Sequence, residues 1–228
     1  VAVSGPVLEG QCRQLVAPFI ARVVHGRPYV TLKWAQSADS KVAGPHGQRV
    51  QISGPASMHL VHGLRARSDA ILIGRSTLEK DDPLLLARGR PDARPLLRIV
   101  LSRHELPMNS QLMRTRESGE VLVDPGSDLP ALMRVLAQRG VTHLLVEGGP
   151  RVHTSFLEAN LVDRAWVFRC PRSIGDLTAP SAIAIDYPPT AELPVEGDVL
   201  TEYLNPRSAV FFAQESSADF ILARQELT

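Results

Sequence analysis

The stretch Val141-Thr-His-Leu-Leu-Val-Glu-Gly-Gly-Pro150 combines a short apolar run with an acid, two glycines and a proline. The run Leu144-Leu-Val146 is too short for a helix and is typical of a strand that is buried on both faces. Apolar residues then recur at helical spacing as far as Leu161. The stretch therefore predicts a strand, a glycine-rich turn and a helix.

Glu147 and the residues after it have two interpretations. Glycines allow a ligand or another backbone segment to approach closely, Pro150 suits the first turn of a helix, and free amides at a helix start bind anions. An acid at the carboxyl end of a buried strand also lies where open α/β sheets bind ligands. Alternatively, the glycines form only a tight turn and Glu147 is a solvated loop acid. Short glycine motifs do not decide between the two.

The composition indicates a globular protein of one large domain or two small ones. The chain has 228 residues, of which 44% are hydrophobic, and a net charge of +1. This charge disfavours a nucleic-acid partner, and no apolar run is long enough to span a bilayer. Cys12 and Cys170 suit a reducing cytoplasm, and no cysteine–histidine cluster has zinc spacing. We therefore expect a cytoplasmic protein with no membrane or nucleic-acid partner and no metal.

Strands and helices are expected to alternate along the chain, which predicts a largely parallel sheet with helices on both faces. The expected strands cover residues 28–36, 69–74, 96–101, 121–124, 144–146 and 164–168, followed by a closing pair at 199–204 and 208–212. Helices are expected over residues 9–20, with a kink or end at Pro18, after Ser53, after Gly74, over 129–139 and after Pro150. Residues 37–54 form a long loop of the kind that binds ligands, and residues 171–198 are expected to be irregular.

Four polar residues lie within or shortly after the expected strands and are candidates for a site. Lys33 lies inside a strand, either on a sheet edge with its amine reaching water or pointing into a site. Thr77 follows a strand that ends in glycine and either caps a helix or helps to bind phosphate. Asp81 is either a helix stop or a carboxylate delivered to a cleft. Arg103 is either a surface residue or the partner of a ribose 2′-phosphate.

Several motifs together resemble the reductase domain of bacterial riboflavin biosynthesis, the C-terminal half of the bifunctional pyrimidine deaminase–reductase. They are Arg27-Pro-Tyr-Val-Thr-Leu-Lys33, Ser37-Ala-Asp39, Leu64-Arg-Ala66, Asp69-Ala-Ile-Leu-Ile-Gly74, Thr77, Asp81-Asp-Pro83, Arg88, Val146-Glu-Gly-Gly-Pro150 and Asn160-Leu-Val-Asp163. Each is weak alone, and their order and spacing together are specific. The resemblance extends from about Arg27 to Phe212.

The resemblance implies a dihydrofolate-reductase-like α/β fold, with a mostly parallel central sheet, helices on both faces and antiparallel closing strands. It divides the chain into a lead-in or linker at residues 1–26 and a reductase domain at residues 27–228. The chain lacks the zinc deaminase signature, a signal-peptide pattern and an initiator methionine. We therefore expect a fragment or a processed chain without the deaminase activity.

The resemblance also implies the reaction. The substrate is 5-amino-6-(5-phosphoribosylamino)uracil, a small molecule, and the cofactor is NADPH. Hydride transfer to C1′ of the ribose gives the ribityl product, so the protein has to align the two reactants and supply a proton. Members of this family pair through their reductase domains, so a homodimer is expected.

Matching positions assign roles to individual residues. The implied cofactor contacts are Gln36, Thr77, Asp81, Arg103 and the segment from Gly149 to Ser155, which includes Pro150 and Arg151. The implied substrate contacts are Arg49, Arg65, Leu85, Arg88 and Glu147. Arg65 and Arg88 can hold the 5′-phosphate. The catalytic set is Asp81, Glu147 and Lys33, in which Asp81 or Glu147 manages the proton and Lys33 contacts the ribityl chain or orients an acid.

The chain departs from the usual family pattern at four positions. Ser40 replaces a glycine, so a left-handed backbone there would be strained. Gln51 replaces a tryptophan that stacks near the cofactor, Arg49 replaces a small serine near the substrate, and Asn160 replaces a glycine. Two alternatives follow from these changes and from the missing deaminase partner. One is a related reductase for another pterin- or pyrimidine-like substrate, and the other is a non-catalytic remnant of a bifunctional enzyme.

Overall fold

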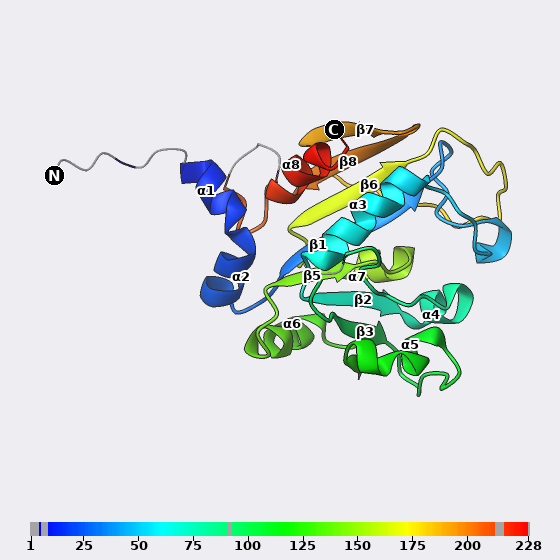
Figure 1. The fold of residues 1–228 in the computed structure, drawn as a ribbon, viewed down its shortest axis with the longest axis horizontal. Coiled ribbons are helices and arrows are strands. Elements are labelled where there is room, and N and C mark those ends of the chain that lie inside the picture. The colour runs from blue at the N-terminus through cyan, green and yellow to red at the C-terminus, as the bar shows by residue number, and fades with distance from the viewer. Residues whose placement is uncertain (1–4, 6–8, 91–92, 213–216, 228) are drawn as a thin grey trace.

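The computed structural model describes residues 5, 9–90, 93–212 and 217–227. A single sheet of eight strands runs through this part of the chain, in the order β4-β3-β2-β5-β1-β6-β8-β7 (Figure 1). The strands are β1 (Tyr29–Gln36), β2 (Ala70–Gly74), β3 (Leu97–Leu101), β4 (Val121–Asp124), β5 (His143–Val146), β6 (Arg164–Arg169), β7 (Ala191–Val195) and β8 (Asp198–Leu204). Strands β1 to β6 pair in parallel, and β8 and β7 close the sheet antiparallel.

Helices cover both faces of the sheet, as expected for parallel strands. They are α1 (Glu9–Leu15), α2 (Ala17–His25), α3 (Pro55–Ala66), α4 (Arg75–Asp81), α5 (Gln111–Arg114), α6 (Leu129–Gln138), α7 (Pro150–Glu158) and α8 (Ala218–Gln225). Two short 3₁₀ helices lie at Pro45–Gly47 and Arg116–Ser118. The expected fold class, α/β with antiparallel closing strands, is confirmed.

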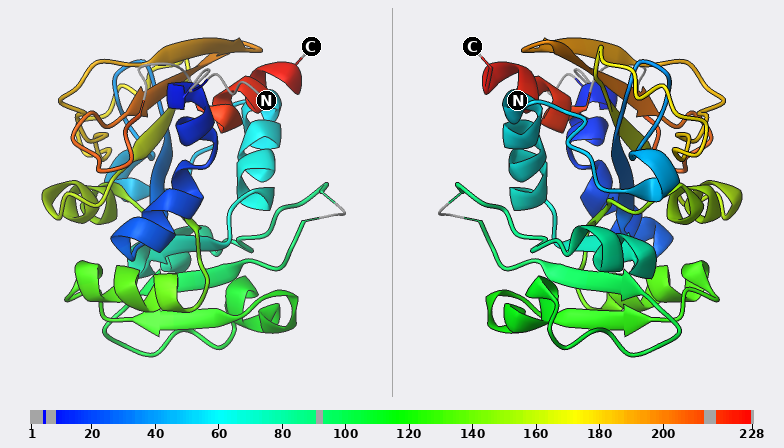
Figure 2. Two further views of the ribbon diagram at one scale, coloured as in Figure 1. Left: turned by 90° about the vertical axis from the view of Figure 1, so that its left-hand side faces the viewer. Right: turned by 90° about the vertical axis from the view of Figure 1, so that its right-hand side faces the viewer.

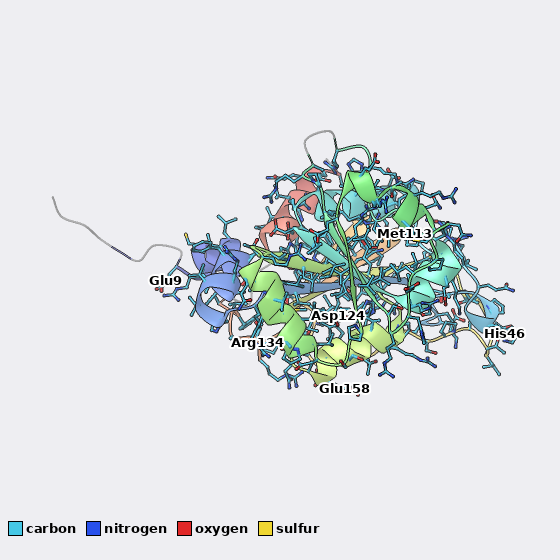
Figure 3. All side chains as sticks on the ribbon, turned by 90° about the horizontal axis from the view of Figure 1, so that it is seen from below. Glu9, His46, Met113, Asp124, Arg134 and Glu158 are labelled. Carbon is cyan, nitrogen blue, oxygen red and sulfur yellow. The ribbon has the colours of Figure 1, made fainter. Side chains whose placement is uncertain are left out.

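The two faces of the sheet carry separate cores because side chains alternate along each strand. Leu145 of β5 packs with the apolar residues of α3 and α8, whereas Leu144 and Val146 pack with those of α6 and α7. Figure 2 shows α8 beside α3 on their common side, and Figure 3 shows Arg134 of α6 and Glu158 of α7 on the opposite side. The face that a strand residue points to therefore decides which helices it meets.

The expected closing strand at residues 208–212 is wrong. These residues form turns, in which the Ser208 hydroxyl donates to the Asp163 carboxylate at 2.5 Å. The outer partner of β8, on the side away from β6, is β7, which lies within the segment expected to be irregular. Strand β7 contains Pro194, which a sheet tolerates at its edge because one side of an edge strand needs no ladder hydrogen bonds.

The single helix expected over residues 9–20 is two helices. Val16 separates α1 from α2, and Pro18 lies in the first turn of α2, where it needs no hydrogen-bond partner for its nitrogen. Ala17 and Ala21 of α2 are fully buried against Tyr29 of β1 and Val210. The division of the chain at residue 26 stays a prediction.

Two of the four unusual positions adopt a left-handed backbone. Ser40 has φ 58° and Asn160 has φ 53°. The strain expected at Ser40 is therefore present, since a Cβ atom crowds the carbonyl oxygen in this conformation. Asn160 carries a smaller cost because its short polar side chain tolerates the same region.

Candidate functional site

The glycines after β5 allow α7 to pack closely on the strand ends. A Cβ atom at Gly148 would lie 2.6 Å from Val152 of α7, and one at Gly74 would lie 2.8 Å from the same side chain. Gly149 is the N-cap of α7 and makes no side-chain capping bond, and a Cβ there would approach only the Thr77 hydroxyl, at 3.9 Å. The turn is therefore tight at Gly148, while the space in front of Gly149 is open.

Lys33 lies beside Glu147 on the face of the sheet that α3 covers. Strand β1 pairs with β5 so that Leu32 is opposite Val146, which puts the next residue of each strand at the same level. The Lys33 amine is 3.8 Å from the Glu147 carboxylate and lies 5.8 Å from the centre of the Phe168 ring. Because β1 is paired on both sides, by β5 and β6, the edge-strand interpretation of Lys33 is wrong.

Arg65 binds Glu147 with two parallel hydrogen bonds. Its Nε donates to Oε1 at 2.7 Å and its Nη2 donates to Oε2 at 2.9 Å, from the last turn of α3. The Glu147 side chain is only 10% exposed. The interpretation of Glu147 as a solvated loop acid is therefore wrong, since the carboxylate is buried and held by a bidentate, charge-assisted pair of hydrogen bonds.

The three side chains carry a surplus of positive charge. Burial alone would raise the pKa of Glu147, but Arg65 and Lys33 outweigh burial and lower this pKa to about 2. Burial lowers the pKa of Lys33, and Glu147 offsets only part of this effect. With Lys33 protonated, two cations surround one carboxylate that is ionised at neutral pH, and we call Lys33, Arg65 and Glu147 the site cluster.

The chain segment 84–90 runs along α3 next to the site cluster. The backbone N–H of Arg88 donates to His62 Nδ1 at 3.2 Å, and Arg65 Nη1 donates to the carbonyl of Leu86 at 3.3 Å. Burial, Arg65 and Arg88 lower the pKa of His62 to about 4, so its ring is neutral and accepts this bond. The side chain of Arg88 is exposed, and Leu85 is buried with φ 53°.

Asp81 and Arg49 form a second group at the end of α4. Arg49 Nη1 donates to the backbone carbonyl of Asp81 at 3.1 Å. Burial raises the pKa of the Asp81 carboxyl, although Arg49 and Lys80 oppose this shift. The contacts of the described residues include none between Asp81 and Glu147, so the structure does not join the two acids named for proton transfer.

The other predicted site residues lie around the carboxyl ends of the strands. Gln36 ends β1, where its Oε1 accepts from Trp34 Nε1 at 2.8 Å. Arg103 follows β3 and is exposed, and Arg151 is exposed on α7, which begins at Pro150. Gln51 is exposed and donates to the carbonyl of Ser53 at 2.8 Å. Ligand contacts by these residues stay predictions.

His62 belongs to the site and is missing from the predicted residues. The sequence contains a usable signal for it, because His62 precedes Arg65 by three positions and residues at this spacing share one side of a helix.

The described residues contain no group of three or more His, Cys, Asp and Glu side chains placed to hold a metal ion. Within the same ranges, every helix is too short or too polar to cross a bilayer.

Comparisons with known proteins agree with this architecture. The family model described as the RibD C-terminal domain matches residues 28–188. The riboflavin biosynthesis protein RibD of Aquifex aeolicus is 33% identical over 197 residues, which cover 77% of this chain and 55% of that protein. The chain therefore belongs to the RibD C-terminal domain family, and the resemblance inferred from the motifs is confirmed.

Solved structures show the same fold. Acinetobacter baumannii RibD aligns with a TM-score of 0.74 at 23% identity, covering 82% of this chain and 60% of that one. A Thermotoga maritima protein titled diaminohydroxyphosphoribosylaminopyrimidine deaminase/5-amino-6-(5-phosphoribosylamino)uracil reductase aligns with a TM-score of 0.71 at 26% identity, covering 86% and 62%. The chain spans about half the length of the RibD relatives it matches.

Proposed function

We propose that this domain reduces the ribose of 5-amino-6-(5-phosphoribosylamino)uracil to its ribityl form in riboflavin biosynthesis, with NADPH as the reductant. The observation that carries the proposal is the site cluster, in which Lys33 of β1 and Arg65 of α3 face the ionised carboxylate of Glu147 at the carboxyl end of β5. This is where open α/β sheets bind ligands. Membership of the RibD C-terminal domain family supports the same reaction.

The substrate would meet the site cluster and the segment 84–90. Arg65 already uses two donors on Glu147, so its position is fixed, while the exposed guanidinium of Arg88 is available to a 5′-phosphate. The remaining lone pairs of Glu147 would accept from pyrimidine N–H groups or ribose hydroxyls. Lys33 would donate to the ribose chain, Leu85 would pack against the pyrimidine, and Arg49 would contact the substrate from the long loop.

The residues at the strand ends fit a dinucleotide. The uncapped amides at Gly149 and the neighbouring Thr77 hydroxyl are suited to a pyrophosphate, because amides at a helix start attract anions. Arg103 would bind the 2′-phosphate, and Gln36, Asp81 and the α7 start at Pro150 and Arg151 would complete the cofactor site. Bound NADPH supplies the hydride, and the chain holds C1′ of the ribose in line with it.

The charge states assign different tasks to the acids. Because the pKa of Glu147 is about 2, this carboxylate is ionised at neutral pH and acts as a hydrogen-bond acceptor. The pKa of Asp81 is raised by burial and the pKa of Lys33 is lowered by burial, so both shift toward neutral pH. These shifts favour Asp81 and Lys33 over Glu147 as the source of the proton that the product nitrogen or oxygen gains.

We also propose that the protein works in the cytoplasm as a homodimer. Cys12 and Cys170 are both free thiols, which suits a reducing compartment. Helix α2 exposes Phe19, Val23 and Val24 at 59%, 60% and 68%, and such an apolar face is a natural contact for a second protein surface.

Isotope transfer tests the proposed reaction directly. NADPH deuterated at C4 of the nicotinamide is incubated with the protein and the phosphoribosylaminouracil, and the product is analysed by mass spectrometry and NMR. We expect deuterium at C1′ of the ribityl chain. Folded protein that binds NADPH and leaves the substrate unchanged would contradict the proposal.

A related reductase acting on another substrate is the second candidate. Arg49, which stands at a substrate position, binds the Asp81 backbone, and Gln51 presents no aromatic surface at the cofactor position. A panel of pterin and pyrimidine substrates, followed by NADPH absorbance, separates the two candidates, and preference for dihydrofolate would favour the second. Absence of NADPH binding in a fluorescence titration would instead favour the non-catalytic remnant.

A further inference from the structure

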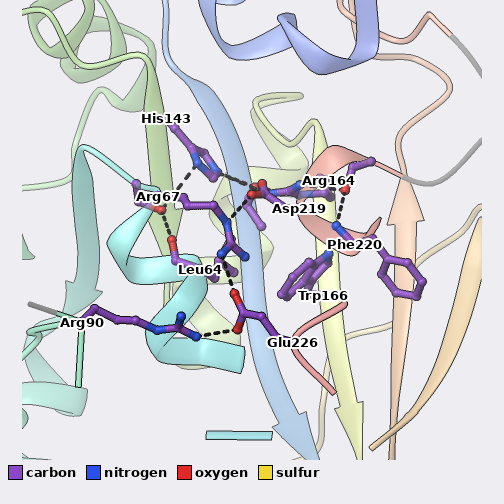
Figure 4. Close-up of polar contacts among 12 residues, drawn as sticks. Leu64, Arg67, Arg90, His143, Arg164, Trp166, Asp219, Phe220 and Glu226 are labelled. Carbon is purple, nitrogen blue, oxygen red and sulfur yellow. Dashed lines mark hydrogen bonds and ion pairs between the residues drawn. The ribbon is translucent and has the colours of Figure 1, made fainter. Parts of the chain in front are cut away.

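The C-terminal helix α8 brings an acid to the segment that carries Leu85 and Arg88. Helix α8 lies beyond the residues matched by the family model and packs beside α3. Its C-cap residue, Glu226, accepts a hydrogen bond from Arg90 Nη2 at 2.5 Å (Figure 4). Arg90 belongs to the segment 84–90, so this ion pair joins that segment to α8.

The Arg90–Glu226 ion pair lies against the backbone of α3 at Gly63. A Cβ atom at Gly63 would lie 3.0 Å from Arg90 Nη2 and 3.0 Å from Glu226 Oε2. Glycine in the middle of a helix is unfavourable because it loses more conformational freedom than alanine. The missing side chain of Gly63 provides the room in which the carboxylate and the guanidinium meet.

The segment 84–90 is held at four points. Buried Arg98 of β3 donates to the carbonyl of Leu84 at 3.3 Å. Arg65 holds Leu86 and His62 holds the backbone of Arg88, as described above. The fourth point is Arg90, whose Nη2 lies 3.1 Å from His59 Nε2 and donates to Glu226. The bond to Glu226 is charged at both ends, so it is stronger than the other three bonds, whose acceptors are neutral.

The docking of α8 does not depend on Glu226. Asp219, in the first turn of α8, binds Arg164 Nη2 at 2.6 Å and Arg67 Nε at 2.7 Å. Phe220 and Ala223 are fully buried in the core on this face. Glu226 also accepts from Arg67 Nη1 at 3.1 Å. A change at Glu226 therefore removes the contacts to Arg90 and to Arg67 Nη1, while Asp219 and the buried side chains keep α8 in place.

We propose that Glu226 is a positioning residue for the substrate site. By fixing Arg90, it holds the segment 84–90 so that the Arg88 guanidinium stays beside the site cluster, ready for the phosphate of the substrate. The proposal rests on the proposed function, in which Arg88 meets that phosphate. It assigns a role in substrate binding to a helix outside the region shared with the family model.

Steady-state kinetics of E226Q, R90Q and the double variant test the proposal. We expect each single change to raise KM for the phosphoribosylaminouracil about tenfold, the size expected for one charged hydrogen bond. The kcat and the KM for NADPH should stay within about twofold of wild type, because neither residue touches the cofactor or the reacting atoms. The KM of the double variant should be no higher than that of R90Q alone, since Glu226 reaches the segment 84–90 through Arg90 and its other bond, to Arg67, lies outside that segment.

A matched control is E120Q, which removes one ion pair, to Arg139, from an exposed site. Hydrogen exchange gives a readout that needs no turnover. The backbone amides of residues 84–90 should exchange faster in E226Q than in E120Q. An inactive wild type with this exchange pattern would overturn only the proposed function. An active E226Q with unchanged KM, additive effects in the double variant, or unchanged exchange at residues 84–90 would overturn the positioning role.

Discussion

Two buried groups of charges lie on the same face of the sheet, and they differ in balance. The site cluster has two cations, Lys33 and Arg65, for the single carboxylate of Glu147. The second group, which we call the closed network, has equal numbers of guanidiniums and carboxyl groups. Its centre consists of Arg67, Arg164, Asp219 and Glu202, together with His143, and Arg67 links this centre to the Arg90–Glu226 pair.

The charged groups of the closed network find opposite charges within the protein, although Nη2 of Arg67 is buried without a hydrogen-bond partner among the described residues. Arg164 binds Asp219 and donates to the Ser217 hydroxyl at 2.9 Å, and Glu202 accepts from Trp166 Nε1 at 3.0 Å. A buried charge without a partner is costly, so a folded chain keeps a surplus only where something else supplies the missing charge. Under the proposed function, charge balance therefore distinguishes a buried group that stabilises the fold from one that receives an anionic ligand.

The largest effect is expected from replacing Arg164 by Met. This change leaves Asp219 and Glu202 buried without their main cation, and breaking a buried pair on one side costs about 3–5 kcal/mol of unfolding free energy. Urea denaturation of wild type and R164M measures the difference. A loss below about 1 kcal/mol would show that the closed network contributes little to stability.

Replacing Lys33 by Met should have the opposite effect on stability. Glu147 keeps both bonds from Arg65, and the buried amine, whose pKa is already lowered by burial, is removed. We expect the unfolding free energy to stay constant or to rise by about 1 kcal/mol. At the same time kcat/KM for the phosphoribosylaminouracil should fall about 100-fold. Denaturation and turnover are measured on one preparation, and destabilisation comparable to that of R164M would remove the contrast.

Acid should weaken the closed network before it affects the site cluster. Burial lowers the pKa of His143 from 6.5 to about 4, so below pH 6.5 the unfolded chain binds a proton that the folded chain excludes. The unfolding free energy should therefore fall by about 2 kcal/mol between pH 6.5 and pH 5 because of this residue. Glu147, with its pKa lowered from 4.5 to about 2, stays ionised over that range.

His143→Gln tests this assignment, because the variant should lose that part of the pH dependence. His153 and His62, whose pKa values are also lowered to about 4, keep their own shares in both proteins. Denaturation midpoints at several pH values provide the measurement. Identical pH profiles for wild type and H143Q would show that His143 does not couple protonation to folding.

The smallest effect is expected from E120Q, which removes an ion pair of similar geometry at the surface. The Arg139 and Glu120 side chains are 35% and 59% exposed. Water screens such pairs, so the unfolding free energy should change by less than about 0.5 kcal/mol. Chemical denaturation checks this value. A larger change would mean that pairing, and not burial, sets the effect of R164M.

The sequence was most informative about elements whose signal is local. The strand at Ala70–Gly74 and the helix after Gly149 follow from apolar runs and capping residues, and Lys33 stood out because an amine interrupts a strand. The pairing of Arg65 with Glu147 joins residues 82 positions apart, so no local pattern contains it. Strand β7 is not predicted because Pro194 and a glutamate interrupt its apolar pattern. The contact of Glu226 with Arg90 depends on where α8 docks, which no local pattern contains.

The central claim is that the surplus charge of the site cluster serves to bind the phosphorylated substrate. The increase in unfolding free energy on substrate binding tests this claim most directly. The phosphoribosylaminouracil at about 100 times its Kd should raise the unfolding free energy of wild type by about 2.7 kcal/mol. We expect R164M to keep this increment despite its lower stability and K33M to lose most of it. A full increment in K33M, or its loss in R164M alone, would contradict the account.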